Sequence, residues 1–240
     1  MRAHPTSPAL PPGGLAVVIG ATGGIGAALL RQLQDSPNFA RVLGLSRSSQ
    51  PALDLLDETS MASAAQHITS LGLDLRLVID ATGYLHGDGH QPEKSWQQLD
   101  PAAMARSFAL NAIGPALLMK HFLPLLPRKG KAVFATLSAK VGSIGDNRLG
   151  GWYSYRASKA ALNQLAHTAA IELRRSHPEA VCVALHPGTV SSALSAPFAK
   201  TGLSVQSPSD AAKKLLNTIE KIDSNESGGF LNQTGEFLPW

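Results

Sequence analysis

Short runs of β-branched and aliphatic residues alternate with segments of helical composition along almost the whole chain. Six runs have the length and composition of strands, at residues 15–19, 41–45, 75–79, 131–137, 180–185 and 230–238. The segments between them predict helices at residues 27–34, 60–71, 96–126, 154–175 and 209–222. Such alternation is typical of a parallel sheet with helices on both faces. Runs such as LAVVI and AVCVAL are apolar throughout, as strands buried on both faces are.

The length of the chain, 240 residues, allows either one large α/β domain or two small domains. No change of composition marks a linker, and the sequence contains no internal repeat. We therefore predict a single doubly wound α/β domain at residues 15–240, with a mostly parallel seven-stranded sheet and helices on both faces. Residues 1–14 are rich in proline and lack the apolar core of a secretory signal, so we expect a flexible tail there.

Composition argues against several classes of protein. No run approaches the ~20 apolar residues of a membrane span, and the single cysteine, Cys182, excludes an internal disulfide. The net charge is +4, but the basic residues are scattered, which argues against nucleic-acid binding. His86 and His90 lack a third ligand, so we predict no metal site. These features predict a cytoplasmic protein that acts on a small molecule.

A glycine-rich turn joins the first strand to the first helix. Its glycines, Gly20, Gly24 and Gly26, form the pattern G-x-x-x-G-x-G. Glycine is needed where backbone approaches a pyrophosphate, and the N–H groups of a helix N-terminus bind phosphate oxygens. No Lys-Ser or Lys-Thr pair follows the turn, which argues against a P-loop triphosphate site. We predict a Rossmann-type dinucleotide site here, with Thr22 and Ile25 as further contacts.

The end of the second strand indicates which dinucleotide binds. An acidic residue at this place hydrogen-bonds the ribose of NAD, whereas an arginine accommodates the 2′-phosphate of NADP. The chain has Ser46 and Arg47 there. Because a guanidinium suits a phosphate well, we expect NADP as the cofactor, with NAD less favoured. A solvated loop arginine is the alternative interpretation of Arg47.

Tyr155 and Lys159 lie four residues apart and therefore share one face of the helix predicted at residues 154–175. The spacing alone indicates little. In a chain that also has a dinucleotide-binding turn earlier in the sequence, it suggests carbonyl reduction. Hydride transfer to a carbonyl needs a proton donor at the nascent alkoxide. The ordinary pKa of tyrosine, ~10, is too high for this task. A nearby ammonium favours the phenolate and makes tyrosine a usable acid and base.

In this order and spacing, the motifs resemble the short-chain dehydrogenase/reductase family over nearly the whole chain, from about residue 15 to residue 240. The resemblance rests on residues 20–26, 80–83 (DATG), 111, 138–159 and 187–190 (PGTV). The stretch GSIGDNRLGGWYSYRASKAALNQ and the ending GEFLPW are most similar to the C-factor-like branch. That branch includes proteins named for a cell–cell signalling role.

The resemblance implies a role for each matching residue. Tyr155 would donate the proton, and Lys159 would lower its pKa and hold the nicotinamide ribose. Asn111 would lie at a helix kink and anchor a water that links Lys159 to solvent. All three would also contact the cofactor, together with Asp54, Leu55, Ala81, Thr82, Gly83, Pro187, Gly188, Val190 and Ser192.

The sequence departs from the family pattern in three places. Residues 80–83 read DATG instead of Asn-Asn-Ala-Gly. Ala139 stands where the family has its catalytic serine, so we predict Ser138 as the hydroxyl that binds the carbonyl oxygen, with Ser143 as the alternative. About three extra residues lie within residues 145–151, before Tyr155, and would border the substrate pocket.

These observations predict an NADP(H)-dependent oxidoreductase that acts on a small carbonyl or alcohol compound. Residues 191–208 are small, polar and punctuated by proline, so we expect a lid over the cofactor there. The low charged fraction, 16%, and the alanines of the helix at residues 154–175 predict a homodimer or homotetramer. A dinucleotide-binding signalling or regulatory protein with little turnover is the second hypothesis.

Overall fold

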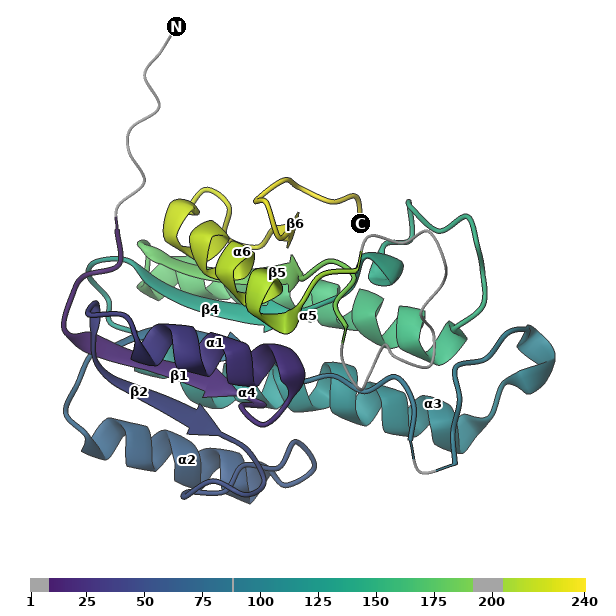
Figure 1. Cartoon of the computed structure of the whole chain (residues 1–240), viewed down its shortest axis with the longest axis horizontal. Helices are drawn as coiled ribbons and strands as arrows, with labels where there is room; N and C mark the ends of the chain where they lie inside the picture. The colour runs from purple at the N-terminus through teal and green to yellow at the C-terminus, as the bar shows by residue number, and fades with distance from the viewer. Residues whose placement is uncertain (1–8, 88, 192–204) are drawn as a thin grey trace, which may run out of the picture.

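The computed structural model describes residues 9–87, 89–191 and 205–240. Its strands form one parallel sheet in the order β2-β1-β3-β4-β5-β6 (Figure 1). The strands are β1 (Gly14–Ile19), β2 (Phe39–Leu45), β3 (Leu75–Asp80), β4 (Ala132–Leu137), β5 (Ala180–His186) and β6 (Phe230–Asn232). The predicted doubly wound α/β fold is therefore confirmed.

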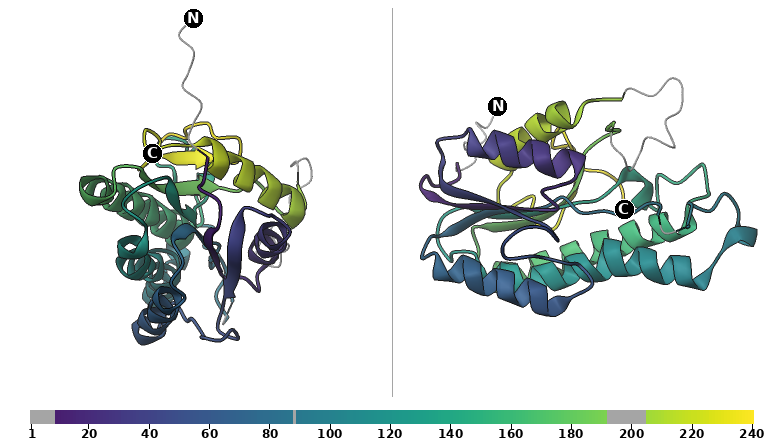
Figure 2. Two further views of the ribbon diagram at one scale, coloured as in Figure 1. Left: turned by 90° about the vertical axis from the view of Figure 1, so that its left-hand side faces the viewer. Right: turned by 60° about the horizontal axis from the view of Figure 1, so that its bottom comes forward.

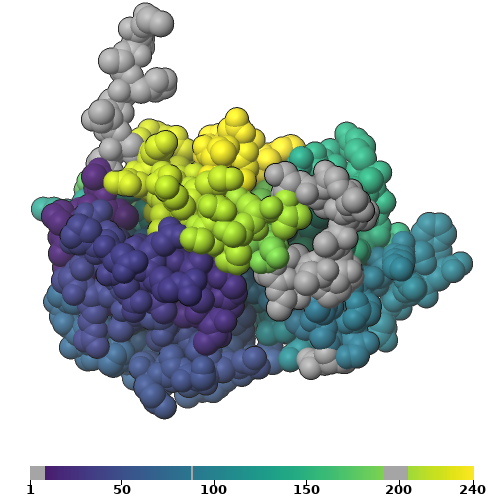
Figure 3. All heavy atoms as spheres, viewed as in Figure 1, coloured from purple at the N-terminus to yellow at the C-terminus, as the bar shows by residue number. Residues whose placement is uncertain are grey.

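Helices cover both faces of the sheet (Figure 2). α1 (Gly24–Gln34) and α6 (Pro208–Lys221) pack on one face, against side chains such as Val18 and Ile79. α2 (Glu58–Ser70), α4 (Gly114–Phe122) and α5 (Tyr153–Ser176) pack on the other, against side chains such as Val17 and Phe134. α3 (Pro101–Phe108) packs beside α5. Each face of the sheet thus has its own apolar core. In the space-filling view of Figure 3, α1 (purple) and α6 (yellow-green) lie side by side on the front of the molecule.

The sheet described by the structure has six strands, so the prediction of seven is wrong. The segment between β2 and β3 contains only a loop and α2, and its loop residues 46–57 include no β-branched run. No strand is therefore added outside β2, which forms an edge of the sheet. The last strand is also shorter than the predicted 230–238, because a turn follows at Asn232, whose Oδ1 accepts from the N–H groups of Thr234 and Glu236.

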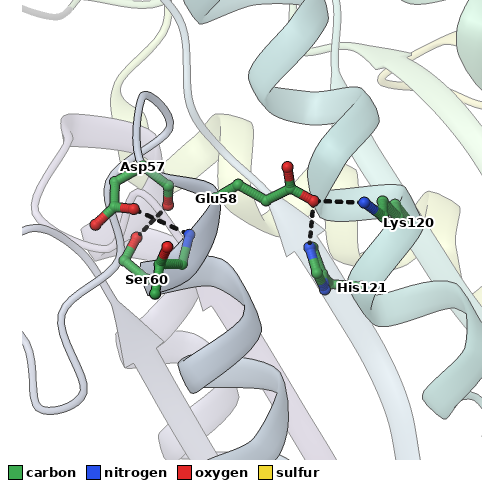
Figure 4. Close-up of polar contacts among 6 residues, drawn as sticks. Asp57, Glu58, Ser60, Lys120 and His121 are labelled. Atoms are coloured by element: carbon green, nitrogen blue, oxygen red, sulfur yellow. Dashed lines mark hydrogen bonds and ion pairs between the residues drawn. The ribbon is translucent and has the colours of Figure 1, made fainter.

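α2 is fixed at its start by short-range contacts (Figure 4). The side chain of Asp57 accepts from Thr59 N at 2.9 Å, and Ser60 Oγ donates to the Asp57 carbonyl at 2.7 Å. Glu58 then joins α2 to α4 through Lys120 Nζ at 2.6 Å and a second contact with His121. These two partners hold the pKa of the Glu58 carboxyl below its usual range. These contacts therefore fix the start of α2 and attach it to α4.

A continuous helical stretch of 25 residues, Pro101–Leu125, runs through α3, a π-helical turn, α4 and a final 3₁₀ turn. An 18-residue window within it has a mean hydropathy of 1.2, so the stretch is long and apolar enough to cross a membrane by length and composition alone. The expectation that no segment is so apolar is therefore wrong. Core helices of globular domains share these properties, and this stretch packs against α2 and α5.

Candidate active site

Five residues of the candidate site lie at or directly after the carboxyl ends of strands. Gly20 follows β1, Ser46 follows β2, Asp80 ends β3, Ser138 follows β4 and Pro187 follows β5. Because the strands are parallel, these residues all lie along the sheet edge formed by the carboxyl ends of the strands, to which the arrowheads in Figure 1 point. β1 pairs with β2 on one side and with β3 on the other, so the direction in which successive strands are added to the sheet reverses at β1. The crevice outside such a switch point is where open α/β sheets bind ligands.

The glycine-rich turn leaves the start of α1 open to a phosphate. Gly20 has a positive φ of 79°, and its carbonyl accepts from Gly23 N at 3.0 Å. A Cβ atom on Gly26 would lie 2.2 Å from that carbonyl oxygen, so only glycine fits. Gly23, the N-cap, makes no side-chain cap, and the first turn of α1 has no acidic residue. Thr22 and Gly24 are exposed beside this helix end. The site fits a pyrophosphate.

The segment after β3 lies against the glycine turn. A Cβ atom on Gly20 would lie 3.1 Å from the Ala81 carbonyl and from Thr82 Cγ2. The buried Asp80 carboxylate accepts from Thr82 N at 3.1 Å, from Thr82 Oγ1 at 2.5 Å and from Thr136 Oγ1 at 2.7 Å. The aspartate thus supplies acceptors that hold the turn leading into Gly83.

Residues predicted to contact the adenosine half follow β2. The Ser46 carbonyl accepts from Leu53 N at 2.8 Å, which brings residues 53–55 next to the end of β2. Asp54 Oδ1 accepts from the next-but-one N–H, and Leu55 packs against the first residue of α4. Arg47 is exposed beside them. The structure thus brings Ser46, Arg47, Asp54 and Leu55 together.

The turn after β5 is held by a glutamine that the sequence motifs did not indicate. Gln206 Nε2 donates to the Pro187 carbonyl at 2.6 Å, and the Gln206 backbone forms a parallel bridge with Val190. Gly188 has a positive φ of 80°. Val190 is buried at this edge. Ser192 and most of the predicted lid lie outside the described residues.

Asn111 lies in a π-helical turn, Ala109–Ile113, which agrees with the kink that the family resemblance implies. Its fully buried side chain accepts from Tyr84 N at 2.8 Å and donates to the Tyr84 carbonyl at 2.7 Å. Its Nδ2 also lies 3.1 Å from Ser158 Oγ on α5. Asn111 therefore fastens the loop after β3 to α5, while its role toward a water stays a prediction.

On α5, Tyr155 is half-buried and Lys159 is buried, next to the end of β4. Lys159 Nζ donates to the Leu137 carbonyl at 2.7 Å. Burial lowers the pKa of Lys159 to about 8, and the charge of Asp80 opposes this shift. Burial raises the pKa of Tyr155 to about 12, which is the opposite direction to the lowering by Lys159 that the family resemblance implies. The Trp152 ring lies edge-on to the Tyr155 ring, at 6.2 Å between centroids. The phenol is thus protonated at neutral pH and lies one helical turn before a lysine that titrates at about 8.

Both candidate serines already donate to protein oxygens. Ser138 Oγ donates to Asn163 Oδ1 on α5 at 2.6 Å. Ser143 Oγ donates to the Trp240 carbonyl at 3.3 Å and accepts from Asp146 N at 3.0 Å. Both residues are buried. The choice of Ser138 over Ser143 as the carbonyl-binding hydroxyl stays a prediction.

His186, the last residue of β5, is half-buried, and its buried Nδ1 lacks a hydrogen-bond partner among the described residues. Burial and, secondarily, the charge of Lys140 lower the pKa of His186 from 6.5 to about 4. The unfolded chain therefore binds a proton at this site before the folded chain does. Its contribution to stability is complete above pH 6.5 and is lost as pH falls toward 4.

We expect His186→Gln to reduce the acid sensitivity of folding. At ~1.4 kcal/mol per pKa unit, the protein should lose roughly 2–3 kcal/mol through His186 between neutral pH and pH ~4. Urea unfolding at both pH values measures this loss, and His67→Gln on α2 is the matched control. An identical loss in wild type and His186→Gln would contradict the assignment.

The sequence motifs did not indicate three residues of the site: Glu93, Asn163 and Gln206. Glu93 contacts Ser154 at the start of α5, and the other two hold Ser138 and Pro187. Each partner is distant along the chain, so no short motif marks the pair. Asn163 alone had a partial signal, because it lies one helical turn after Lys159.

A sequence profile described as short chain dehydrogenase matches residues 52–202, more than half of the chain. The chain belongs to the short-chain dehydrogenase/reductase family. The family resemblance inferred from the motifs is therefore confirmed, and with it a fold built for dinucleotide binding.

Two curated members of this family show where the chain lies within it. It is 29% identical over 233 residues to a 1-hydroxy-2-glutathionyl-2-methyl-3-butene dehydrogenase of Rhodococcus sp. (strain AD45), covering 93% of this chain and 98% of that protein. It is 36% identical over 143 residues to the C-signal of Myxococcus xanthus, covering 59% of this chain and 81% of that protein. The second likeness supports the C-factor-like branch.

Solved carbonyl reductases share the fold. The NADPH-bound carbonyl reductase from chicken fatty liver superposes with a TM-score of 0.84 at 25% identity, covering 97% of this chain and 96% of that one. The carbonyl reductase Sniffer of D. melanogaster superposes with a TM-score of 0.80 at 22% identity, covering 95% of this chain and 100% of that one. The family and the NADPH-bound neighbour support a hydride-transfer oxidoreductase that uses a nicotinamide dinucleotide.

Proposed function

We propose that the protein is an NADP(H)-dependent reductase of small carbonyl compounds in which Tyr155 is the general acid. The observation that carries this proposal is the pair formed by the half-buried Tyr155 and the buried Lys159 on one face of α5. The pair lies at the end of β4, on the same sheet edge as the glycine turn. A binding module has no need of such a proton donor.

The residues at this edge fit a dinucleotide in three places. Gly20, Gly26 and the uncapped start of α1 would hold the pyrophosphate. Arg47 would pair with the ribose phosphate, and the backbone at Val190 would hold the nicotinamide end. The bound cofactor supplies the hydride. The chain supplies binding, orientation and the proton.

Tyr155 would give its phenolic proton to the oxygen of the substrate as that oxygen gains negative charge. In the free protein burial raises the pKa of this phenol to about 12, so a positive charge nearby must lower it for proton transfer near neutral pH. The ammonium of Lys159 favours the phenolate that remains, since an opposite charge nearby stabilises it. Lys159 itself titrates at about 8 because it is buried. Most Lys159 side chains are therefore charged at neutral pH, and this charge stabilises the phenolate that forms when Tyr155 gives up its proton.

A panel of aldehydes, ketones and quinones with NADPH tests this proposal, with loss of nicotinamide absorbance as the readout. We expect turnover of at least one compound class. The second candidate function is a dinucleotide-binding signalling protein with little turnover, which Ala139 and the likeness to the C-signal favour. Tight NADPH binding without reduction of any compound on the panel would favour that second function.

Arg47→Ala tests the preference for NADP. A charge-assisted contact with the 2′-phosphate is worth ~1.5–3 kcal/mol, so the Kd for NADPH should rise about tenfold to a hundredfold. The Kd for NADH should change little, because NADH lacks that phosphate. Fluorescence titration measures both, with Arg41→Ala on the exposed part of β2 as the control. Equal weakening of both cofactors would refute the phosphate contact.

We further propose that the protein is a homo-oligomer that pairs through α4 and α5. A groove of about 510 Å³ between these helices supports the proposal. Small and apolar side chains line much of it, among them Ala116, Met119, Leu123, Leu165 and Ala169. Small residues at such a face let two helices approach closely. Light scattering decides the matter, and the mass of a single chain would contradict pairing.

A further inference from the structure

The start of α5 is capped by a side chain from a distant loop. Glu93 is buried, and its Oε2 accepts from Ser154 N at 3.2 Å while its Oε1 accepts from Ser154 Oγ. The Glu93 carbonyl accepts from Trp152 N at 2.5 Å. By contrast, α2, α3 and α6 are capped by their own N-cap side chains. Trp152, the N-cap residue of α5, provides no such cap.

The backbone before α5 has a conformation that needs external support. Trp152 has a φ of +52°, and it is the one non-glycine residue with a positive φ in the described part of the chain. Gly150 and Gly151 precede it with φ values of +63° and +65°. A left-handed conformation costs a bulky residue ~1–2 kcal/mol. The Glu93 carbonyl and Arg156 Nε, which donates to the Gly151 carbonyl at 2.9 Å, hold this turn.

The turn determines where two site side chains lie. Tyr155 directly follows Ser154, and the Trp152 ring lies edge-on to it. Glu93 belongs to the loop after β3. Asn111 holds the start of this loop, because its side chain bonds both the N–H and the carbonyl of Tyr84. The loop after β3 is therefore attached to α5 near both of its ends: Asn111 joins Tyr84 to Ser158, and Glu93 binds Ser154.

We propose that Glu93 is a positioning residue that fixes the start of α5, and with it the Tyr155 hydroxyl and the Trp152 ring, for proton transfer to the substrate. This inference rests on the proposed carbonyl reductase function. A displacement of ~1 Å at a reacting group can cost ~10²-fold in rate. Loss of a helix cap costs only ~1 kcal/mol of stability. Removal of the Glu93 side chain should therefore impair turnover in a protein that still folds.

Hydrogen exchange with Glu93→Ala and Glu93→Gln tests the anchoring directly. In Glu93→Ala, the amides of residues 152–156 should exchange about tenfold faster, since local opening no longer breaks the contacts to the carboxylate. Glu93→Gln retains an oxygen that accepts from Ser154 N and should exchange nearly as wild type does. Asp100→Ala is the matched control: it removes the cap of α3, where Asp100 Oδ1 accepts from Ala103 N at 2.7 Å, and should leave residues 152–156 unchanged.

Turnover with NADPH and two probes, 4-nitrobenzaldehyde and menadione, tests the catalytic part. We expect kcat to fall ~10–100-fold in Glu93→Ala while the Kd for NADPH stays within about threefold. Glu93→Gln should restore most of kcat, and Asp100→Ala should retain it. Wild-type exchange at residues 152–156, or undiminished kcat, in Glu93→Ala would overturn the proposal, as would equal impairment of both Glu93 variants. If wild type reduces neither probe nor any other compound of the panel, the proposed function fails, and the exchange data still decide whether Glu93 anchors α5.

Discussion

Tyr155→Phe is expected to lower kcat for carbonyl reduction by ~10²–10⁴-fold, the usual contribution of a general acid, while NADPH still binds. The substitution removes the phenolic proton and leaves the ring that packs against Trp152. Lys159 keeps its contact with the Leu137 carbonyl, so the site should hold its shape. Steady-state turnover and fluorescence titration with NADPH measure the two quantities separately.

Tyr153→Phe is the matched control for this experiment. It makes the same chemical change two residues earlier, at the first residue of α5, and should leave kcat nearly unchanged. A Tyr155→Phe variant that retains turnover within a few-fold of wild type would show that another group donates the proton.

Gly26→Ala is expected to abolish NADPH binding, with a Kd at least about a hundredfold higher. The new Cβ would lie 2.2 Å from the Gly20 carbonyl oxygen and 2.9 Å from its carbon, so the turn must open. Overpacking of this kind costs ~1–3 kcal/mol of stability. It also moves the start of α1, on which the pyrophosphate contact depends. NADPH titration of the folded variant, checked by circular dichroism, measures the loss.

Gly23→Ala in the same turn provides the control. Its Cβ would lie 3.4 Å from the same Gly20 oxygen, an ordinary contact, and its φ of −76° suits alanine. NADPH should bind this variant within a few-fold of wild type. Equal affinity of wild type and Gly26→Ala would contradict the phosphate-binding role of the turn.

Most of the fold follows from the sequence because buried parallel strands are continuous apolar runs. β3 and β5 begin where the runs LRLVI and AVCVAL predict, and each extends one residue further. The strand count was wrong because the loop after β2 leads directly into α2. The last strand was too long because side-chain contacts of Asn232 form a turn that apolar patterning does not reveal.

The parts of the site that depend on short spacings were the most predictable. Gly20 and Gly26 share one turn, and Tyr155 and Lys159 share one helix face, so local rules apply to both pairs. Glu93 and Gln206 reach partners on other elements, and nothing in their neighbourhood in the sequence points to those partners. The carbonyl-binding hydroxyl stays open because Ala139 occupies the expected place and the nearby serines bond elsewhere.

Transfer of deuterium from NADPH labelled at the nicotinamide C4 tests the central claim most directly. Each of the two C4 epimers is incubated with the enzyme and a carbonyl compound that the panel shows to be reduced, and the alcohol is analysed by mass spectrometry. We predict that the alcohol carries one deuterium from one epimer and none from the other, since hydride leaves a single face of a bound ring. Alcohol without deuterium from either epimer would contradict hydride transfer at this site.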